Sequence, residues 1–389
     1  MISILHFSNT LTRGGVEEHM LSLLRGLDRR VFHPYLACTP AVLNEIGSDI
    51  PQDVEVFPTQ LVSFRSLGAA FKLGRFLRSK RIQILHCHMF QSSLLAAPIA
   101  RLCRVPVVIE TPHVREHWRR GWLKGRFVVD RLVGTAVDHY IAVSQANAEY
   151  LESGKRLPKR KITQIRQGCD VQHFRGPCDV PADFKQSLGF DECDPVLAVI
   201  GRLEPQKGHA ILFEALPLIR REFPNVRVVC AGEGSLRCEL ADRVKQLGLC
   251  DHVKFVGYQA DVAPWLAIAD ISVLPSFYEG LPIAAIESIA AGCPVVATAV
   301  DGTPEVVIDG NTGFTVPPGK PELLAQAICR LLRDSNLRSL MAREGRHWAE
   351  QFSRERFVRD TQDFYLRAWQ QRHSASRIAN AGSCVTSSR

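Results

Sequence analysis

The chain has 389 residues, 46% of them hydrophobic and 23% charged, which is the balance of an ordinary soluble globular protein. At roughly 150 residues per domain, this length allows two to three domains. No stretch approaches the ~18 uninterrupted apolar residues of a membrane-spanning helix. The first residues, MISILHFSNT, read as a strand because they lack the regions of a signal peptide.

Twelve cysteines are scattered without a CxxC or a Cys/His metal spacing. We expect those inside apolar runs to be reduced core residues, which favours a cytoplasmic protein. These are Cys87, Cys103, Cys230, Cys293 and Cys329.

The net charge of +8 is unevenly distributed. Residues 1–170 hold 24 Lys+Arg against 14 Asp+Glu, a balance of +10, whereas the remainder holds 24 against 26, a balance of −2. This asymmetry suggests that the first half faces a polyanion or an anionic membrane.

Along the first half, residues 2–27 read as strand, glycine turn and amphipathic helix. A further helix is predicted at 66–80, where Leu67, Phe71 and Leu77 approximate helical spacing. Strands are expected at 82–88, 105–111 and 138–144. Short apolar runs that alternate with helices indicate a parallel sheet covered by helices on both faces.

The βα pattern is interrupted at 165–195, a stretch rich in glycine, proline and acidic residues, and restarts at 196–219. Strands follow at 226–234, 253–259, 271–276, 293–298 and 313–318. Each half opens with a strand, a glycine-bearing loop and a helix. Ligands of open α/β sheets bind at the carboxyl ends of the strands, so two such domains facing each other would form one cleft.

The predicted fold is therefore α/β with two Rossmann-like domains. We expect an N-terminal domain at 1–170, a linker at 171–194 and a C-terminal domain at 195–352. We expect a helix at 353–372 to return to the N-terminal domain. The tail 373–389 is polar and rich in small residues, which predicts disorder.

Two loops have the composition of phosphate-binding loops. Gly14 and Gly15 follow the first strand, where backbone amides at a helix N-terminus can approach a phosphate, although an ordinary tight turn would look the same. Arg202 and Lys207, in GRLEPQKG, could hold a diphosphate, or they could simply be solvated cations.

The segment SFYEGLPIAAIES places two carboxylates in apolar surroundings. Pro282 suits the first turn of a helix, so Glu279 should lie in the loop before the helix and Glu287 inside it. The free amides near Gly280 and Leu281 would then point at a ligand. A carboxylate buried without partners is unfavourable, and sugar hydroxyls could satisfy it. The alternative is a capped surface helix with two solvated acids.

In this order, GGVE, GRLEPQKG, EGLPIAAIE and AGCPVVAT…GTPEVVIDGNTGFTVPPG resemble the pattern of glycosyltransferase family 4 over nearly all of residues 1–370. EGLPIAAIE fits that family's E-x(7)-E signature. The resemblance implies a GT-B fold and retaining transfer of a sugar from a UDP- or GDP-sugar to a hydroxyl acceptor. It also implies that domain 1–170 binds the acceptor and that domain 195–352 binds the nucleotide sugar. As alternatives of similar fold, a UDP-sugar 2-epimerase and a non-catalytic nucleotide-sugar-binding protein remain open.

The resemblance also implies roles for individual residues. Arg202 and Lys207 would bind the donor diphosphate and stabilise the charge that develops on it, helped by Gly14 and Gly15. Glu287 would hold the ribose. The remaining donor contacts would be Glu279 to the transferred sugar, the Gly280 and Leu281 amides to its hydroxyls or the β-phosphate, Tyr258 to the base, and His113 to the sugar and reacting centre. His86 and His88 could line the acceptor pocket, or at least one could be a satisfied core histidine.

No DxD-type metal motif stands in the expected position, which predicts a metal-independent enzyme with no cofactor. No separate carboxylate nucleophile is evident either. We therefore expect front-face departure of the diphosphate, with the acceptor proton passing to the leaving group.

A stretch rich in basic and aromatic residues follows His113. Such a composition fits peripheral attachment to anionic lipid at the inner face of the cytoplasmic membrane, although a solvated basic lid fits equally. The acceptor would then be a lipid-linked or cell-surface glycan. No RRM or KH pattern supports nucleic-acid binding. The residues concerned are Arg115, Trp118, Arg119, Arg120, Trp122, Lys124 and Arg126.

Overall fold

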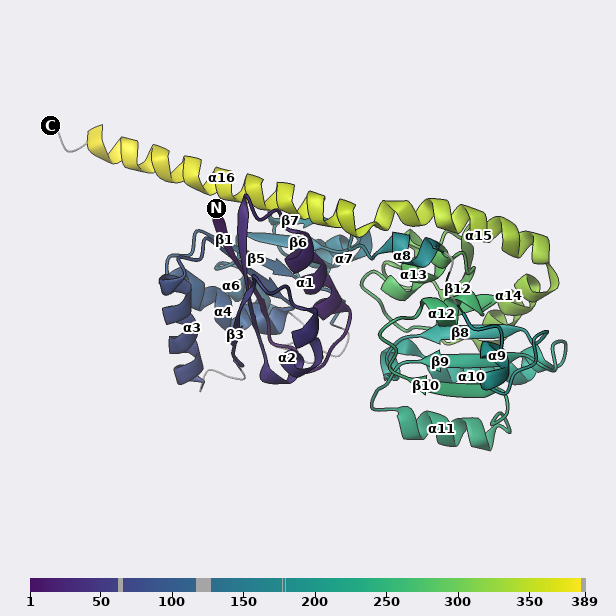
Figure 1. Cartoon of the computed structure of the whole chain (residues 1–389). Coiled ribbons are helices and arrows are strands. Elements are labelled where there is room, and N and C mark those ends of the chain that lie inside the picture. Colours follow the sequence, from purple (N-terminus) through teal and green to yellow (C-terminus); the bar gives the residue numbers. More distant parts are fainter. Residues whose placement is uncertain (62–65, 117–126, 177, 179, 386–389) are drawn as a thin grey trace. The chain divides into compact units, whose positions relative to one another are not determined.

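The computed structural model describes residues 1–61, 66–116, 127–176, 178 and 180–385, with side chains described as far as residue 374. These residues form two compact α/β units, coloured purple to blue and teal to green in Figure 1, with helix α16 in yellow. Unit 1 comprises Met1–Gln167 and Glu355–Arg389, and unit 2 comprises Gly168–Arg354.

Unit 1 is built on a parallel sheet of seven strands in the order β3-β2-β1-β4-β5-β6-β7. The order reverses between β1 and β4, and the crevice at such a switch point is where open α/β sheets bind ligands. The strands are β1 (Ile2–Ser8), β2 (Phe32–Cys38), β3 (Glu55–Pro58), β4 (Ile84–His88), β5 (Val107–Thr111), β6 (His139–Ala142) and β7 (Ile162–Gln164).

Alternation along each strand gives this sheet two buried faces. Leu5, Leu85 and Val108 face a core shared with α3 and α4, whereas Ile4, Ile84 and Ile109 face α1 and α16. The helical segments of unit 1 are α1 (Gly15–Gly26), α2 (Pro40–Ile46), η1 (Gly47–Asp49), α3 (Leu67–Ser79), α4 (Phe90–Leu102), α6 (Val128–Val133), α7 (Gln145–Glu149), η2 (Tyr150–Gly154), η3 (Lys159–Lys161) and α16 (Arg354–Val385).

Unit 2 repeats the plan with six parallel strands in the order β10-β9-β8-β11-β12-β13, and its switch point lies between β8 and β11. The strands are β8 (Val196–Ile200), β9 (Arg227–Ala231), β10 (Val253–Gly257), β11 (Ile271–Leu274), β12 (Val295–Thr298) and β13 (Gly313–Val316). The helical segments are α8 (Val171–Arg175), α9 (Phe184–Ser187), η4 (Pro205–Lys207), α10 (His209–Arg220), α11 (Arg237–Gln246), α12 (Ala263–Ala267), α13 (Ile283–Ala291), η5 (Thr303–Glu305), α14 (Pro321–Arg333), α15 (Ser335–Ala349) and η6 (Glu350–Phe352).

The boundaries differ from the sequence-based ones in two places. The expected linker 171–194 lies within unit 2, where Phe184 and Phe190 join the core around Trp265. The expected disordered tail begins inside α16, which continues to Val385. The segment contains no proline and several alanines, so it can continue a helix that packing has already nucleated.

Helix α3 forms where it was predicted, but two of its three marker residues are not core. Leu67 and Phe71 are 75% and 73% exposed, whereas Leu73, Phe76 and Leu77 are buried. The buried face of α3 is therefore rotated about the helix axis relative to the face on which Leu67 and Phe71 lie.

Candidate active site

The loop after β8 places two cations at the switch point of unit 2. Arg202 is exposed, and Lys207 closes the short helix η4. Gly208 follows with φ +65° and caps α10; a Cβ there would lie 2.1 Å from the Pro275 carbonyl oxygen. The side chain of Lys207 and the positive N-terminus of a 12-residue helix therefore act at the same place.

The loop after β11 brings Glu279 to Lys207. Lys207 Nζ lies 2.6 Å from Glu279 Oε1, and Ser276 Oγ donates to the same oxygen at 2.7 Å. The Glu279 side chain is only 6% exposed and that of Lys207 is 18% exposed. The chain itself therefore supplies two partners to this buried carboxylate, which does not depend on a ligand for its hydrogen bonds.

Gln206 holds the two loops together. Its side-chain Nε2 donates to the Tyr278 carbonyl at 2.9 Å, and its backbone carbonyl accepts from Phe277 N at 2.8 Å. Arg202 Nη2 lies 3.5 Å from Gln206 Oε1. The third loop, after β12, contributes Asp301, which accepts from Glu279 N at 3.0 Å. The result is a preorganised group of two cations, Arg202 and Lys207, and two anions, the buried Glu279 and the half-buried Asp301.

The remaining predicted donor residues of unit 2 belong to α13, to the loop before it and to the loop after β10. Gly280 and Leu281 are buried and directly precede α13, with Pro282 at its N-cap. Glu287 is half-buried inside α13. Burial raises the pKa of the Cys169 thiol, and the nearby charge of Glu287 raises it further. Tyr258 is 55% exposed after the edge strand β10, two strands away from β8.

In unit 1, Gly14 is the N-cap of α1 and has an extended backbone. Its carbonyl accepts from the amides of Glu17 and Glu18, both at 3.1 Å. A Cβ on Gly15 would meet no atom of the described residues within 4 Å, so the described part of the chain leaves this turn open. Gln167 Nε2 donates to the Gly15 carbonyl at 3.2 Å and ties the turn to the end of the unit 1 sheet.

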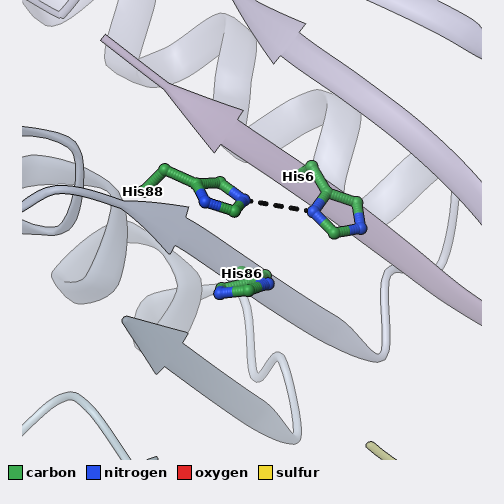
Figure 2. A group of neighbouring side chains, drawn as sticks. All are labelled: His6, His86 and His88. Atoms are coloured by element: carbon green, nitrogen blue, oxygen red, sulfur yellow. Dashed lines mark hydrogen bonds between the residues drawn. The ribbon is translucent and has the colours of Figure 1, made fainter. Parts of the chain in front are cut away.

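The carboxyl edge of this sheet gathers five buried histidines. His6 and His86 are register partners on β1 and β4, and His88 follows on the same face of β4. Figure 2 shows His88 directed toward His6, with His6 Nδ1 3.2 Å from His88 Nε2 and His86 beside them. His88 Nδ1 in turn lies 3.3 Å from Nε2 of His113, which follows β5. His19, on α1, packs its ring against that of His113 at 4.6 Å between centroids.

Burial keeps these imidazoles neutral. It lowers the pKa of His113 to about 3 and that of His6 to about 3, and it also lowers the pKa of His19, His86 and His88 well below the usual value. His86 is a satisfied core histidine, because its two nitrogens lie 2.6 Å from the Tyr365 hydroxyl and 2.7 Å from Thr111 Oγ1.

Most of the predicted acceptor or membrane stretch, Trp118, Arg119, Arg120, Trp122, Lys124 and Arg126, lies outside the described residues. Arg115 is described and contacts its own unit: its Nη2 donates to the Ala146 carbonyl at 3.3 Å, and its guanidinium lies 5.7 Å from the centroid of the Tyr150 ring. Among the described residues, no helix is both long and apolar enough to cross a membrane.

Sequence reasoning missed Ser276, Gln206, Asp301, His6 and His19 as parts of these groups. Ser276 and Gln206 stand within four residues of Glu279 and Arg202, so proximity in the motifs could have indicated them. His19 carried no such signal, because only the packing of α1 on the sheet brings it to His113.

Comparison with known proteins identifies the family. Residues 181–348 match the glycosyl transferases group 1, and residues 13–173 match glycosyltransferase family 4. An uncharacterized glycosyltransferase of Methanocaldococcus jannaschii is 30% identical over 90% of this chain and 94% of its own length. The GDP-mannose-dependent alpha-(1-6)-phosphatidylinositol monomannoside mannosyltransferase of Mycolicibacterium smegmatis is 30% identical over 66% of this chain and 68% of its own length.

The fold agrees with that identification. The structure of Anabaena HepE in complex with UDP-glucose superposes with a TM-score of 0.81 at 20% identity, covering 94% of this chain and 99% of that one. Two parallel sheets with the same switch-point topology thus define an α/β protein of the GT-B fold. The chain belongs to the group 1 glycosyltransferases, as its sequence motifs predicted.

Proposed function

We propose that this glycosyltransferase transfers a sugar, with retention of configuration, from a UDP- or GDP-sugar to a hydroxyl of a lipid-linked or cell-surface glycan. The observation that carries the proposal is the ion pair of Lys207 with Glu279 beside Arg202 at the unit 2 switch point. Among relatives, the M. smegmatis enzyme is named as GDP-mannose-dependent, and HepE was solved with UDP-glucose.

In the proposed mechanism, the bond between the anomeric carbon and the diphosphate oxygen breaks first. Negative charge then develops on the diphosphate, where Arg202, Lys207 and the α10 N-terminus stabilise it without reorganising. The acceptor hydroxyl adds to the same face of the sugar, and its proton passes to the leaving diphosphate oxygen. Because side chains supply the positive charge, we propose that transfer requires no metal.

The carboxylates and the other donor contacts complete the proposal. Glu279, fixed by Lys207 and Ser276, would accept hydrogen bonds from the transferred sugar, and Glu287 from the ribose. For the Gly280 and Leu281 amides and for Tyr258, we propose the donor contacts that the family resemblance implies. Gly14, Gly15 and His113 keep the roles that the family resemblance implies.

A panel of UDP- and GDP-sugars tests the proposal. Each donor is incubated with the protein in EDTA, and the products are separated by chromatography and NMR. We expect at least one donor to release its nucleoside diphosphate and to yield the retained anomer. A 2-epimerase would give an epimeric sugar, and a binding protein would show affinity without turnover. Either result would overturn the proposed function.

A further inference from the structure

Unit 1 contains more buried histidines at this edge of its sheet than the proposed transfer reaction needs. Two groups of three place their ligand nitrogens within 4.8 Å of one another: His6 with His86 and His88, and His19 with His88 and His113. We propose that His19, His88 and His113 bind a divalent transition metal of the zinc class.

The hydrogen bonds of the two groups decide between them. In the first group, His86 already uses both nitrogens, so a metal there would break its bond to Tyr365 or to Thr111. In the second group, His19 is 1% exposed, and neither of its ring nitrogens has a hydrogen-bond partner among the residues that the structure describes. The side chain of Gln167 lies near His19, but its geometry is outside that of a hydrogen bond to either ring nitrogen. A metal ion would give one of these nitrogens a partner and so remove the free-energy cost of burying it unpaired.

The spacing fits a tetrahedral ion. Two nitrogens at 2.0–2.1 Å from zinc are about 3.3–3.4 Å apart at the tetrahedral angle, and His88 Nδ1 lies 3.3 Å from His113 Nε2. Since all ligand atoms are within 4.8 Å, the nitrogen of His19 needs to approach by at most about 1.5 Å.

The surroundings also match a metal site. With His88 Nδ1 on the ion, its Nε2–H donates to His6 Nδ1 at 3.2 Å (Figure 2). Metal-bound histidines characteristically donate their second nitrogen in this way, which fixes the tautomer. His6 is thus a positioning residue. His113 is 6% exposed while His88 is fully buried, so the fourth position of the ion would open on the His113 side and hold water.

Metal binding is independent of the proposed function, but one consequence rests on it. If His113 contacts the donor sugar, the metal occupies its Nε2 and zinc inhibits transfer. Direct binding is therefore the primary test, and inhibition is measured separately.

The experiment titrates Zn²⁺ into the tag-free, chelator-treated full chain by calorimetry, after alkylation of accessible thiols, because Cys193, Cys238 and Cys250 are exposed. Co²⁺ absorption reports the coordination. We expect one ion per chain with a tetrahedral nitrogen spectrum. His19→Phe keeps the ring that packs on Phe357 and should weaken binding by more than about 100-fold, beyond the 10–100-fold typical of outer-shell losses.

A matched control is His209→Phe, which changes the buried His209 of unit 2. In the described part of the chain, the ring nitrogens of His209 also lack hydrogen-bond partners, but His209 belongs to neither group of three. This variant should bind zinc as the wild type does. If His19→Phe does not fold, His113→Ala replaces it with the same expected loss. No stoichiometric binding by the wild type, or binding that survives these substitutions, would overturn the metal site whatever the transfer assay shows.

Discussion

Lys207 Nζ and Glu279 Oε1 lie 2.6 Å apart, although 72 residues separate them in the sequence. The pair joins the loop after β8 to the loop after β11, on the two sides of the unit 2 switch point. Glu279 is nearly buried, so this contact both stabilises the site and presents a cation where the proposed diphosphate would bind.

Removing either partner of that pair leaves the other charge poorly solvated. We expect Lys207→Met and Glu279→Gln each to destabilise unit 2 by about 2–3 kcal/mol, below the range for fully buried pairs because Lys207 is partly exposed. Urea unfolding of both variants and the double variant should give a coupling above about 1 kcal/mol. Lys80 and Glu55 form the control pair, with the same 2.6 Å distance but greater exposure, so their coupling should be smaller. Equal couplings would refute this account.

Both the backbone conformation at position 208 and the closeness of the neighbouring atoms require a glycine there. Its φ is +65°, and a Cβ added to it would lie 2.1 Å from the Pro275 carbonyl oxygen, so Gly208→Ala must displace the loop that carries Lys207. We expect a loss of more than about 2 kcal/mol together with weaker donor binding. Gly248 has the same φ and open space, so Gly248→Ala should lose only the ~1–2 kcal/mol of left-handed strain. Thermal melts that rank the two variants in reverse would contradict the close contact.

Glu110 makes unit 1 sensitive to pH. Burial raises its pKa to about 7 from a usual 4.5, despite the opposing effects of Lys155 and Ser93. The folded protein therefore keeps a proton that the unfolded chain releases above pH 4.5, so this stabilising contribution is full below pH 4.5 and is lost as pH rises through 7.

For Glu110→Gln this implies a pH-dependent comparison. Between about pH 4.5 and 7 the wild type should lose about 3 kcal/mol relative to the variant, which has no proton to release. Urea midpoints at about pH 5 and about pH 8 measure this change, with the exposed Glu152→Gln as control. A difference between wild type and Glu110→Gln that stays constant with pH would exclude the protonated carboxyl.

Tyr365 anchors α16 to the sheet of unit 1 through His86. Tyr365→Phe keeps the packing but leaves a His86 nitrogen buried without its partner, so we expect a loss of about 1–3 kcal/mol. Tyr258→Phe, at an exposed tyrosine, should change the unfolding midpoint little. Similar midpoints for both variants would show that the hydrogen bond contributes nothing.

The sequence predicted both α/β units because buried parallel strands appear as continuous apolar runs. It did not indicate β2, β3 or β7. Pro34 interrupts the apolar pattern of β2, and β3 and β7 are short edge strands whose residues are half-exposed or exposed.

The motifs indicated Arg202, Lys207 and Glu279 as candidate site residues. They did not indicate the ion pair of Lys207 with Glu279, because a contact across 72 residues depends on strand order. The histidine cluster was hidden for the same reason. His19, His88 and His113 belong to α1, β4 and the loop after β5, and only the sheet order brings β1, β4 and β5 side by side.

The central claim, that Arg202 and Lys207 stabilise the departing diphosphate, is tested most directly by the rate of nucleoside diphosphate release with the best donor from the panel. We predict that Arg202→Ala and Lys207→Ala each lower this rate by about 10²–10³-fold. The control Lys245→Ala, at an exposed lysine on α11, should retain the wild-type rate. Release at the wild-type rate by both site variants would contradict the claim.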